Sequence, residues 1–167
     1  NTNNGIYQLT DFYIQFYHDF CSRHTTDEHF WENSINSPKQ NTWYGLAYER
    51  LCMAHIPQIK EALGIQRIRT EYYSWRSKES VPAAQVDLII ERADQIISLC
   101  EIKYSKGIYS LDAKEEERLR NRITDFADET KVKEAVQLVL ITTYGLKDNA
   151  HSTEVNDRVV LDDLFKS

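Results

Sequence analysis

Two neighbouring stretches decide the fold of this chain: Gln85-Val86-Asp87-Leu88-Ile89-Ile90-Glu91 and Ile96-Ile97-Ser98-Leu99-Cys100-Glu101-Ile102-Lys103. Both are rich in β-branched and apolar residues, and Arg92-Ala93-Asp94-Gln95 separates them. This pattern predicts a β-hairpin. Because side chains alternate along a strand, Gln85 and Asp87 share one face of the first strand, and Glu101 and Lys103 share one face of the second. A turn of four or five residues then places Asp87 opposite Glu101.

Two carboxylates that face each other across a hairpin repel, so the fold needs a cation near Asp87 and Glu101. Lys103 can supply part of that charge, and a divalent metal ion can supply the rest. The competing interpretation is a solvated outer face of an antiparallel hairpin, because charged residues are common there. The combination of an Asp on one strand with Glu-x-Lys on the next, among apolar neighbours, favours a functional site.

Length and composition indicate one domain with a small appendage. The chain has 167 residues, of which 41% are hydrophobic, enough for a sizeable core. Its formal net charge of −6 gives no overall attraction to nucleic acid, so any such contact needs a local basic patch. Three widely spaced cysteines, Cys21, Cys52 and Cys100, indicate a reducing, cytoplasmic compartment. No run is long and apolar enough to predict a membrane helix. The first residue is Asn1, so we expect a fragment of a longer protein.

The rest of the chain alternates between helical and strand patterns. Apolar residues recur at helical spacing over 43–63, with Glu49 at the border of the apolar face and Pro57 expected to kink or split the helix near Ile56. A highly charged helix is expected over 112–131, and its charges, including Arg118, Arg120 and Arg122, have the pattern of a solvated helix face. Strands are expected over 67–75, 136–142 and 159–161, followed by a short helical turn over 162–165.

The N-terminal third is dense in aromatic residues. A short strand is expected over 5–9 and a helix over 11–21, while 22–42 has the composition of an irregular connection. The helix carries an apolar stripe that we expect to pack on the core or to form an interface: Phe12, Tyr13, Phe16, Tyr17 and Phe20. A zinc site is a weaker alternative for this region. It would use His18, Cys21, His24 and His29, but no second cysteine pair accompanies them.

The order of helix, three strands, helix and buried strand, with these polar residues, resembles the PD-(D/E)XK nucleases. The resemblance implies an α/β, restriction-endonuclease-like fold with a mixed central sheet flanked by helices (an αβββαβ core). It implies an active site of an acid on the first helix, an Asp on one strand and Glu-x-Lys on the next. Here these are Glu49, Asp87, Glu101 and Lys103, with Gln85 just before the Asp. Val86 replaces the proline of the family pattern.

A closer resemblance covers nearly the whole chain and involves the C-terminal region of prokaryotic AAA ATPases of the archaeal-type family. It rests on five runs: 7–13 (YQLTDFY), 45–49 (GLAYE), 62–65 (ALGI), 100–103 (CEIK) and 161–165 (LDDLF). It implies that 1–42 is an N-terminal helical segment and linker, the tail of a winged-helix region, and that 43–167 is the nuclease-like domain. The ATP-binding module and the rest of the winged-helix region would then lie in the full-length protein, because this chain has no G-x-x-x-x-G-K-[ST] run.

The resemblance implies metal-dependent hydrolysis of phosphodiester bonds in nucleic acid, with DNA as the first expectation and no membrane partner. Mg²⁺ or Mn²⁺ would be held by Asp87, Glu101, the Ile102 carbonyl and Glu49, since hard cations prefer oxygen ligands. Lys103 would orient the attacking water or stabilise negative charge, and Gln85 would help to position these groups. The alternative is a catalytically inactive module that docks to the ATPase or regulates it, with Glu101 and Lys103 as a structural charge pair.

Overall fold

The computed structural model describes residues 11–22, 26–78 and 83–166. Its centre is a mixed five-stranded sheet in the order β1-β2-β3-β4-β5. The strands are β1 (Thr70–Arg76), β2 (Gln85–Arg92), β3 (Ile96–Lys103), β4 (Ala135–Thr142) and β5 (Val155–Val160). The first three strands are antiparallel, and β4 and β5 run parallel to β3. The expected hairpin over 85–91 and 96–103 is therefore confirmed, as is an α/β fold with a mixed sheet flanked by helices.

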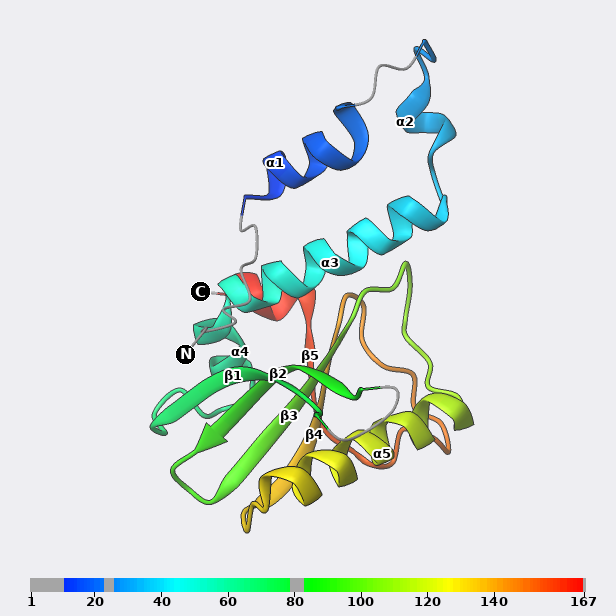
Figure 1. The fold of residues 1–167 in the computed structure, drawn as a ribbon. Helices are drawn as coiled ribbons and strands as arrows, with labels where there is room; N and C mark the ends of the chain where they lie inside the picture. The colour runs from blue at the N-terminus through cyan, green and yellow to red at the C-terminus, as the bar shows by residue number, and fades with distance from the viewer. Residues whose placement is uncertain (1–10, 23–25, 79–82, 167) are drawn as a thin grey trace.

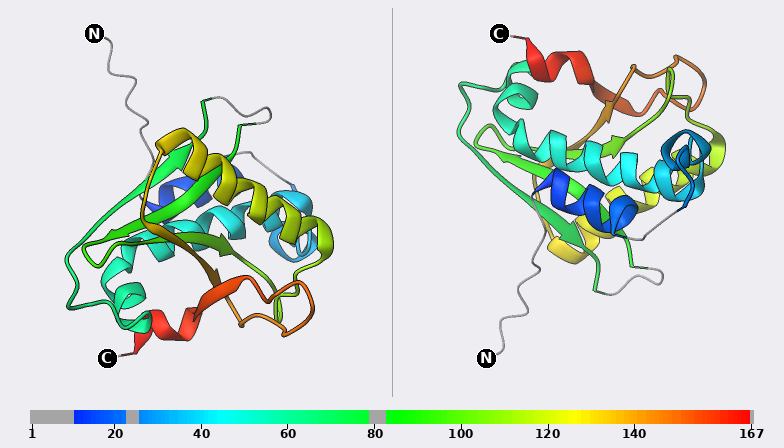
Figure 2. Two further views of the ribbon diagram at one scale, coloured as in Figure 1. Left: turned by 90° about the horizontal axis from the view of Figure 1, so that it is seen from below. Right: turned by 90° about the horizontal axis from the view of Figure 1, so that it is seen from above.

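Helices cover both faces of this sheet (Figures 1 and 2). On one face lie α3 (Pro38–Ala54) and α4 (Ile56–Ala62), and on the other lies α5 (Ala113–Thr130), which connects β3 to its parallel neighbour β4. Successive side chains of the buried strand β4 point to opposite faces of the sheet. Val139 and Ile141 belong to the core under α3 and α4, and Leu138 and Leu140 belong to the core under α5. The split of the first long helix at His55, just before Pro57, is also confirmed.

Local signals explain where the two long helices begin. The Asp112 side chain accepts a hydrogen bond from the Glu115 amide, and Glu115 and Glu116 lie in the first turn of α5, where the helix dipole favours negative charge. Helix α3 begins at Pro38, because the Ser37 side chain caps it by accepting from the Gln40 amide and proline suits the first helical position. The irregular connection expected over 22–42 is therefore wrong in part: it also contains α2 (Phe30–Asn33).

The remaining boundaries differ from the expectations by a few residues. Strand β1 begins at Thr70, after a turn in which the Ile68 amide bonds to the Ile65 carbonyl. Strand β5 begins at Val155 and ends at Val160, and the short helical turn that follows, η2 (Leu161–Phe165), includes Leu161. The strand expected over 5–9 lies outside the described residues. Within the described ranges, no helix is long and apolar enough to cross a membrane.

The N-terminal helical segment runs beside α3 as α1 (Phe12–Phe16), continued by a π-helical turn, η1 (Tyr17–Cys21) (Figures 1 and 2). The stripe expected there is only partly buried. Phe20 is buried, and its ring lies 5.4 Å from Trp31 and 5.9 Å from Trp43 of α3. Phe12, Tyr13 and Tyr17 are exposed, so the contact with α2 and α3 covers only part of the stripe.

Candidate active site

The candidate site forms where β2 and β3 stop pairing. The last paired residues are Leu88 and Cys100, so the next position along the hairpin places Asp87 against Glu101. Beyond that point the Ile102 amide donates a 3.4 Å hydrogen bond to Oδ2 of Asp87. The Asp87 carboxylate thus gives a partner to a backbone group at the end of the ladder. The pairing of β1 with β2 also shifts register nearby, between Tyr73 and Trp75, an irregularity often found beside functional sites.

Glu101 is a buried carboxylate surrounded by cations. Its side chain is 1% exposed, and Nζ of Lys103 lies 2.7 Å from its Oε1. Nη1 of Arg122 forms a direct ion pair with the other oxygen, Oε2, and Nη2 of Arg118 lies 3.8 Å from Oε1. Such pairing is required, because an unpaired charge inside a protein costs several kcal/mol. Lys103 also lies 3.7 Å from Glu115 at the start of α5.

Sequence reasoning missed the contribution of α5. Arg118 and Arg122 lie four residues apart and therefore on one side of the helix, and that side faces Glu101. Arg120, in contrast, is exposed and pairs with Glu116 and Glu154, as a solvated helix face would. The signal that could have distinguished them was the spacing of Arg122 relative to the buried Leu119 and Phe126, which flank it at three and four residues.

Glu49 reaches the same region from α3. Partial burial raises the pKa of its carboxyl group to about 7, helped by the negative charges of Asp87 and Glu101 and opposed by Lys103. Burial and the charge of Glu101 likewise raise the pKa of Asp87, against the Ile102 amide, Lys103 and Arg122. The charges of Glu101 and Lys103 therefore act on the carboxyl groups of both Glu49 and Asp87, although the four predicted site residues come from three different elements.

Gln85 lies at an exposed position at the start of β2, where it pairs with Arg76 of β1. It is two residues from Asp87, and its contribution to the site stays a prediction.

Of the residues in the alternative zinc set, His24 lies outside the described residues. Cys21 is exposed, and Cys52 and Cys100 are buried, as expected for thiols in apolar surroundings.

The donor set suits a hard cation in its chemistry, because two carboxylates and the Ile102 carbonyl supply oxygen atoms. Among the described residues, however, no three His, Cys, Asp or Glu side chains lie close enough together to hold a metal ion. The predicted metal ligands are thus reduced to Asp87, Glu101 and the Ile102 carbonyl, which stay a prediction.

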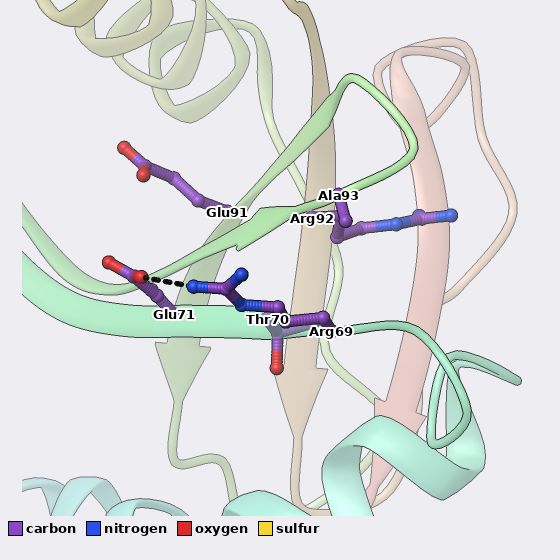
Figure 3. Close-up of a pocket in the computed structure, with 6 residues that line it drawn as sticks. All are labelled: Arg69, Thr70, Glu71, Glu91, Arg92 and Ala93. Carbon is purple, nitrogen blue, oxygen red and sulfur yellow. Dashed lines mark ion pairs between the residues drawn. The ribbon is translucent and has the colours of Figure 1, made fainter.

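A shallow pocket of about 210 Å³ lies at the other end of the β1–β2 pair (Figure 3). It is lined by Arg69, Thr70, Glu71, Glu91, Arg92 and Ala93. Glu91 is four residues from Asp87, which corresponds to about 13 Å along a strand. Arg69 lies 3.7 Å from Glu71, and both side chains are exposed. Since the charges of opposite sign compensate one another, this pocket has no clear preference for a charged ligand.

Comparison with known proteins adds little to this geometry. No protein-family model matches the chain, and no curated protein matches it. A solved structure titled as a protein of unknown function, AF1548, is similar with a TM-score of 0.46 and 15% sequence identity over 68% of this chain. The match spans 64% of that protein's length.

Proposed function

We propose that this chain is a metal-dependent nuclease domain with a restriction-endonuclease-like fold, which hydrolyses phosphodiester bonds in nucleic acid. The observation that supports the proposal best is the end of the β2–β3 hairpin. There Asp87 bonds to the β3 backbone beside the buried Glu101, whose Oε1 lies 2.7 Å from Lys103. A hairpin with a purely structural role has no need for two acids at this point, since they raise each other's cost of ionisation.

In this proposal Asp87, Glu101 and the Ile102 carbonyl hold Mg²⁺ or Mn²⁺. The bound ion would lower the pKa of its water and polarise the phosphate. Lys103 extends from the same strand as Glu101 and is partly exposed, so its ammonium group can orient the water or stabilise negative charge on the phosphate. Glu49, with a pKa of about 7, can accept a proton near neutral pH.

A cleavage assay tests the proposal. With Mg²⁺ or Mn²⁺ the protein should nick DNA, whereas the larger Ca²⁺, which has looser coordination, should support little turnover. Lys103→Ala should retain metal binding and lose about a hundredfold in rate, because it removes charge stabilisation and no ligand. Asp87→Asn and Glu101→Gln should lose both metal binding and cleavage. Glu117→Gln, an exposed neutralisation on α5, is the matched control and should cleave like the wild type.

Glu101→Gln leaves three cations without their buried counter-charge, so its folding must be checked by circular dichroism. Asp87→Asn, which leaves those ion pairs in place, keeps the test valid if Glu101→Gln fails to fold. A nuclease activity that survives both Asp87→Asn and Lys103→Ala would belong to a contaminant and would overturn the proposal.

The second candidate is a catalytically inactive module that docks to the ATPase or regulates it. The neutralisation of Glu101 by arginines and a lysine favours this candidate, because a carboxylate already paired on both oxygens needs no metal for stability. Calorimetry separates the two candidates: absence of any Mg²⁺ or Mn²⁺ binding and of cleavage by the wild type would favour the docking module. Attachment to an ATPase and a winged-helix region belongs to both proposals.

A further inference from the structure

Arg122 occupies a position that matters for any metal at this site. Its Nη1 forms the ion pair with Oε2 of Glu101, while Lys103 and, at a longer distance, Arg118 pair with Oε1, so both oxygens of the carboxylate already have a cation. The Arg122 guanidinium thus occupies one oxygen of a carboxylate that is a predicted metal ligand.

Lys103, Arg118 and Arg122 differ in the carboxylate partners that would remain if a metal ion bound to Glu101. Lys103 and Arg118 both have Glu115 as a second carboxylate partner. Arg122, among the described residues, has Glu101 as its only carboxylate partner. Its side chain is 17% exposed, compared with 55% for Arg120 two positions earlier on α5. Loss of Glu101 would therefore leave a charged, largely buried guanidinium that needs a new anion.

We propose that Arg122 is the built-in counter-cation of Glu101, that a divalent ion binds in exchange for it, and that the released guanidinium then contacts a phosphate group of the substrate. This inference rests on the proposed nuclease function. A guanidinium suits the second role because its planar set of donors matches phosphate oxygens. Helix α5 would thus couple the arrival of the metal to the binding of the substrate backbone.

The test compares Mn²⁺ affinity, measured by calorimetry without nucleic acid, in the wild type, Arg122→Met and Arg120→Met. Methionine keeps an unbranched apolar stem and a high helix propensity. Arg122→Met should bind Mn²⁺ about tenfold more tightly than the wild type, since the metal no longer displaces a hydrogen bond to a charged group. Arg120→Met loses the same charge from the same helix but does not contact Glu101, so its affinity should stay near that of the wild type.

Cleavage at saturating Mn²⁺ tests the second role. Arg122→Met should cleave at least about tenfold more slowly than the wild type despite its tighter metal binding, because it has lost a phosphate contact. Arg122→Lys, which keeps a positive charge, should fall between the two in both measurements and serves as the safeguard if Arg122→Met does not fold.

The outcomes are distinguishable. Equal Mn²⁺ affinity in the wild type and Arg122→Met would overturn the exchange and leave the nuclease proposal standing. Tighter metal binding with unchanged cleavage would overturn the phosphate contact alone. If neither protein binds Mn²⁺, the metal site itself is absent, and the proposed function and the exchange both fall.

Discussion

At the scale of single residues, the raised pKa of the Glu49 carboxyl group links the candidate site to the stability of the fold. It lies half-buried on α3, and the negative charges of Asp87 and Glu101 add to the effect of burial in raising its pKa to about 7. An ordinary glutamate in the unfolded chain has a pKa of 4.5. Between these two values the folded protein holds a proton that the unfolded chain has released, so folding becomes less favourable as the pH rises through this range.

This difference predicts the pH dependence of stability. The contribution of Glu49 is fully present below pH 4.5 and is lost as the pH rises through about 7. We therefore expect the free energy of unfolding, measured with denaturant, to fall less between pH 5 and pH 8 in Glu49→Gln than in the wild type. Since Asp87 is shifted in the same direction, the variant should keep part of the dependence. An identical loss in both proteins would show that Glu49 ionises as it would in water.

Three of the four principal candidates could be placed together from the sequence, because they lie in one hairpin. Register and side-chain alternation act over few residues, so Asp87, Glu101 and Lys103 follow from the two strand patterns. Glu49 followed only from the family resemblance. The spacing of Arg122 from Leu119 and Phe126 could place it on the inner side of α5. Its contact with Glu101 could not be predicted, because that contact depends on how α5 rotates over the sheet, which the packing of residues distant in the chain decides.

At the scale of elements, α5 combines packing and electrostatics. Phe126 of this helix is fully buried. The centroid of its ring lies 5.4 Å from that of Trp75 on β1, in an edge-to-face arrangement. Leu119, three residues before Arg122, and Phe126, four residues after it, are both buried. Their packing fixes the direction in which the Arg122 side chain extends. The alignment of Arg118 and Arg122 with Glu101 therefore depends on the apolar face of the helix.

Phe126→Ala tests this dependence. It should lower the free energy of unfolding by about 3–5 kcal/mol, because it removes a large buried ring and leaves a cavity. Thr124→Ala, at an exposed position of the same helix, should change stability by less than about 0.5 kcal/mol. Denaturant unfolding followed by circular dichroism measures both. A loss below about 1 kcal/mol for Phe126→Ala would contradict the assigned packing of α5.

The start of α3 is marked by capping residues, but the apolar periodicity does not extend to it. Ser37-Pro38 is a recognisable helix start, because serine caps and proline suits the first turn. The apolar pattern becomes clear only from Trp43, so the pattern alone places the polar first turn in the preceding connection.

At the scale of the whole molecule, a cluster of aromatic rings joins the N-terminal segment to α3. Phe16, Phe20, Trp31 and Trp43 meet with centroid separations of 5.2–5.9 Å. Lys39 places its ammonium group 4.9 Å from the centre of the Phe20 ring, which adds a cation–π contact. The cluster involves α1, η1, α2 and α3 but none of the strands, so it can open without disrupting the sheet.

Hydrogen exchange tests that separation. Phe20→Ala should increase exchange of the amides of residues 11–21 and leave those of β3 and β4 protected, since opening here is local. Tyr13→Ala is the control, because Tyr13 is 73% exposed and its loss should change neither region. Residues 11–21 that exchange freely in the wild type would contradict the packing of this segment on α3.

The central claim is that the end of the β2–β3 hairpin is a metal site, and a crystal soaked in Mn²⁺ tests it most directly. The account predicts an anomalous peak in contact with the carboxylates of Asp87 and Glu101 and the Ile102 carbonyl, with Arg122 moved off Oε2 of Glu101. A soaked crystal with no peak at these three groups, and with Arg122 still paired to Glu101, would contradict it.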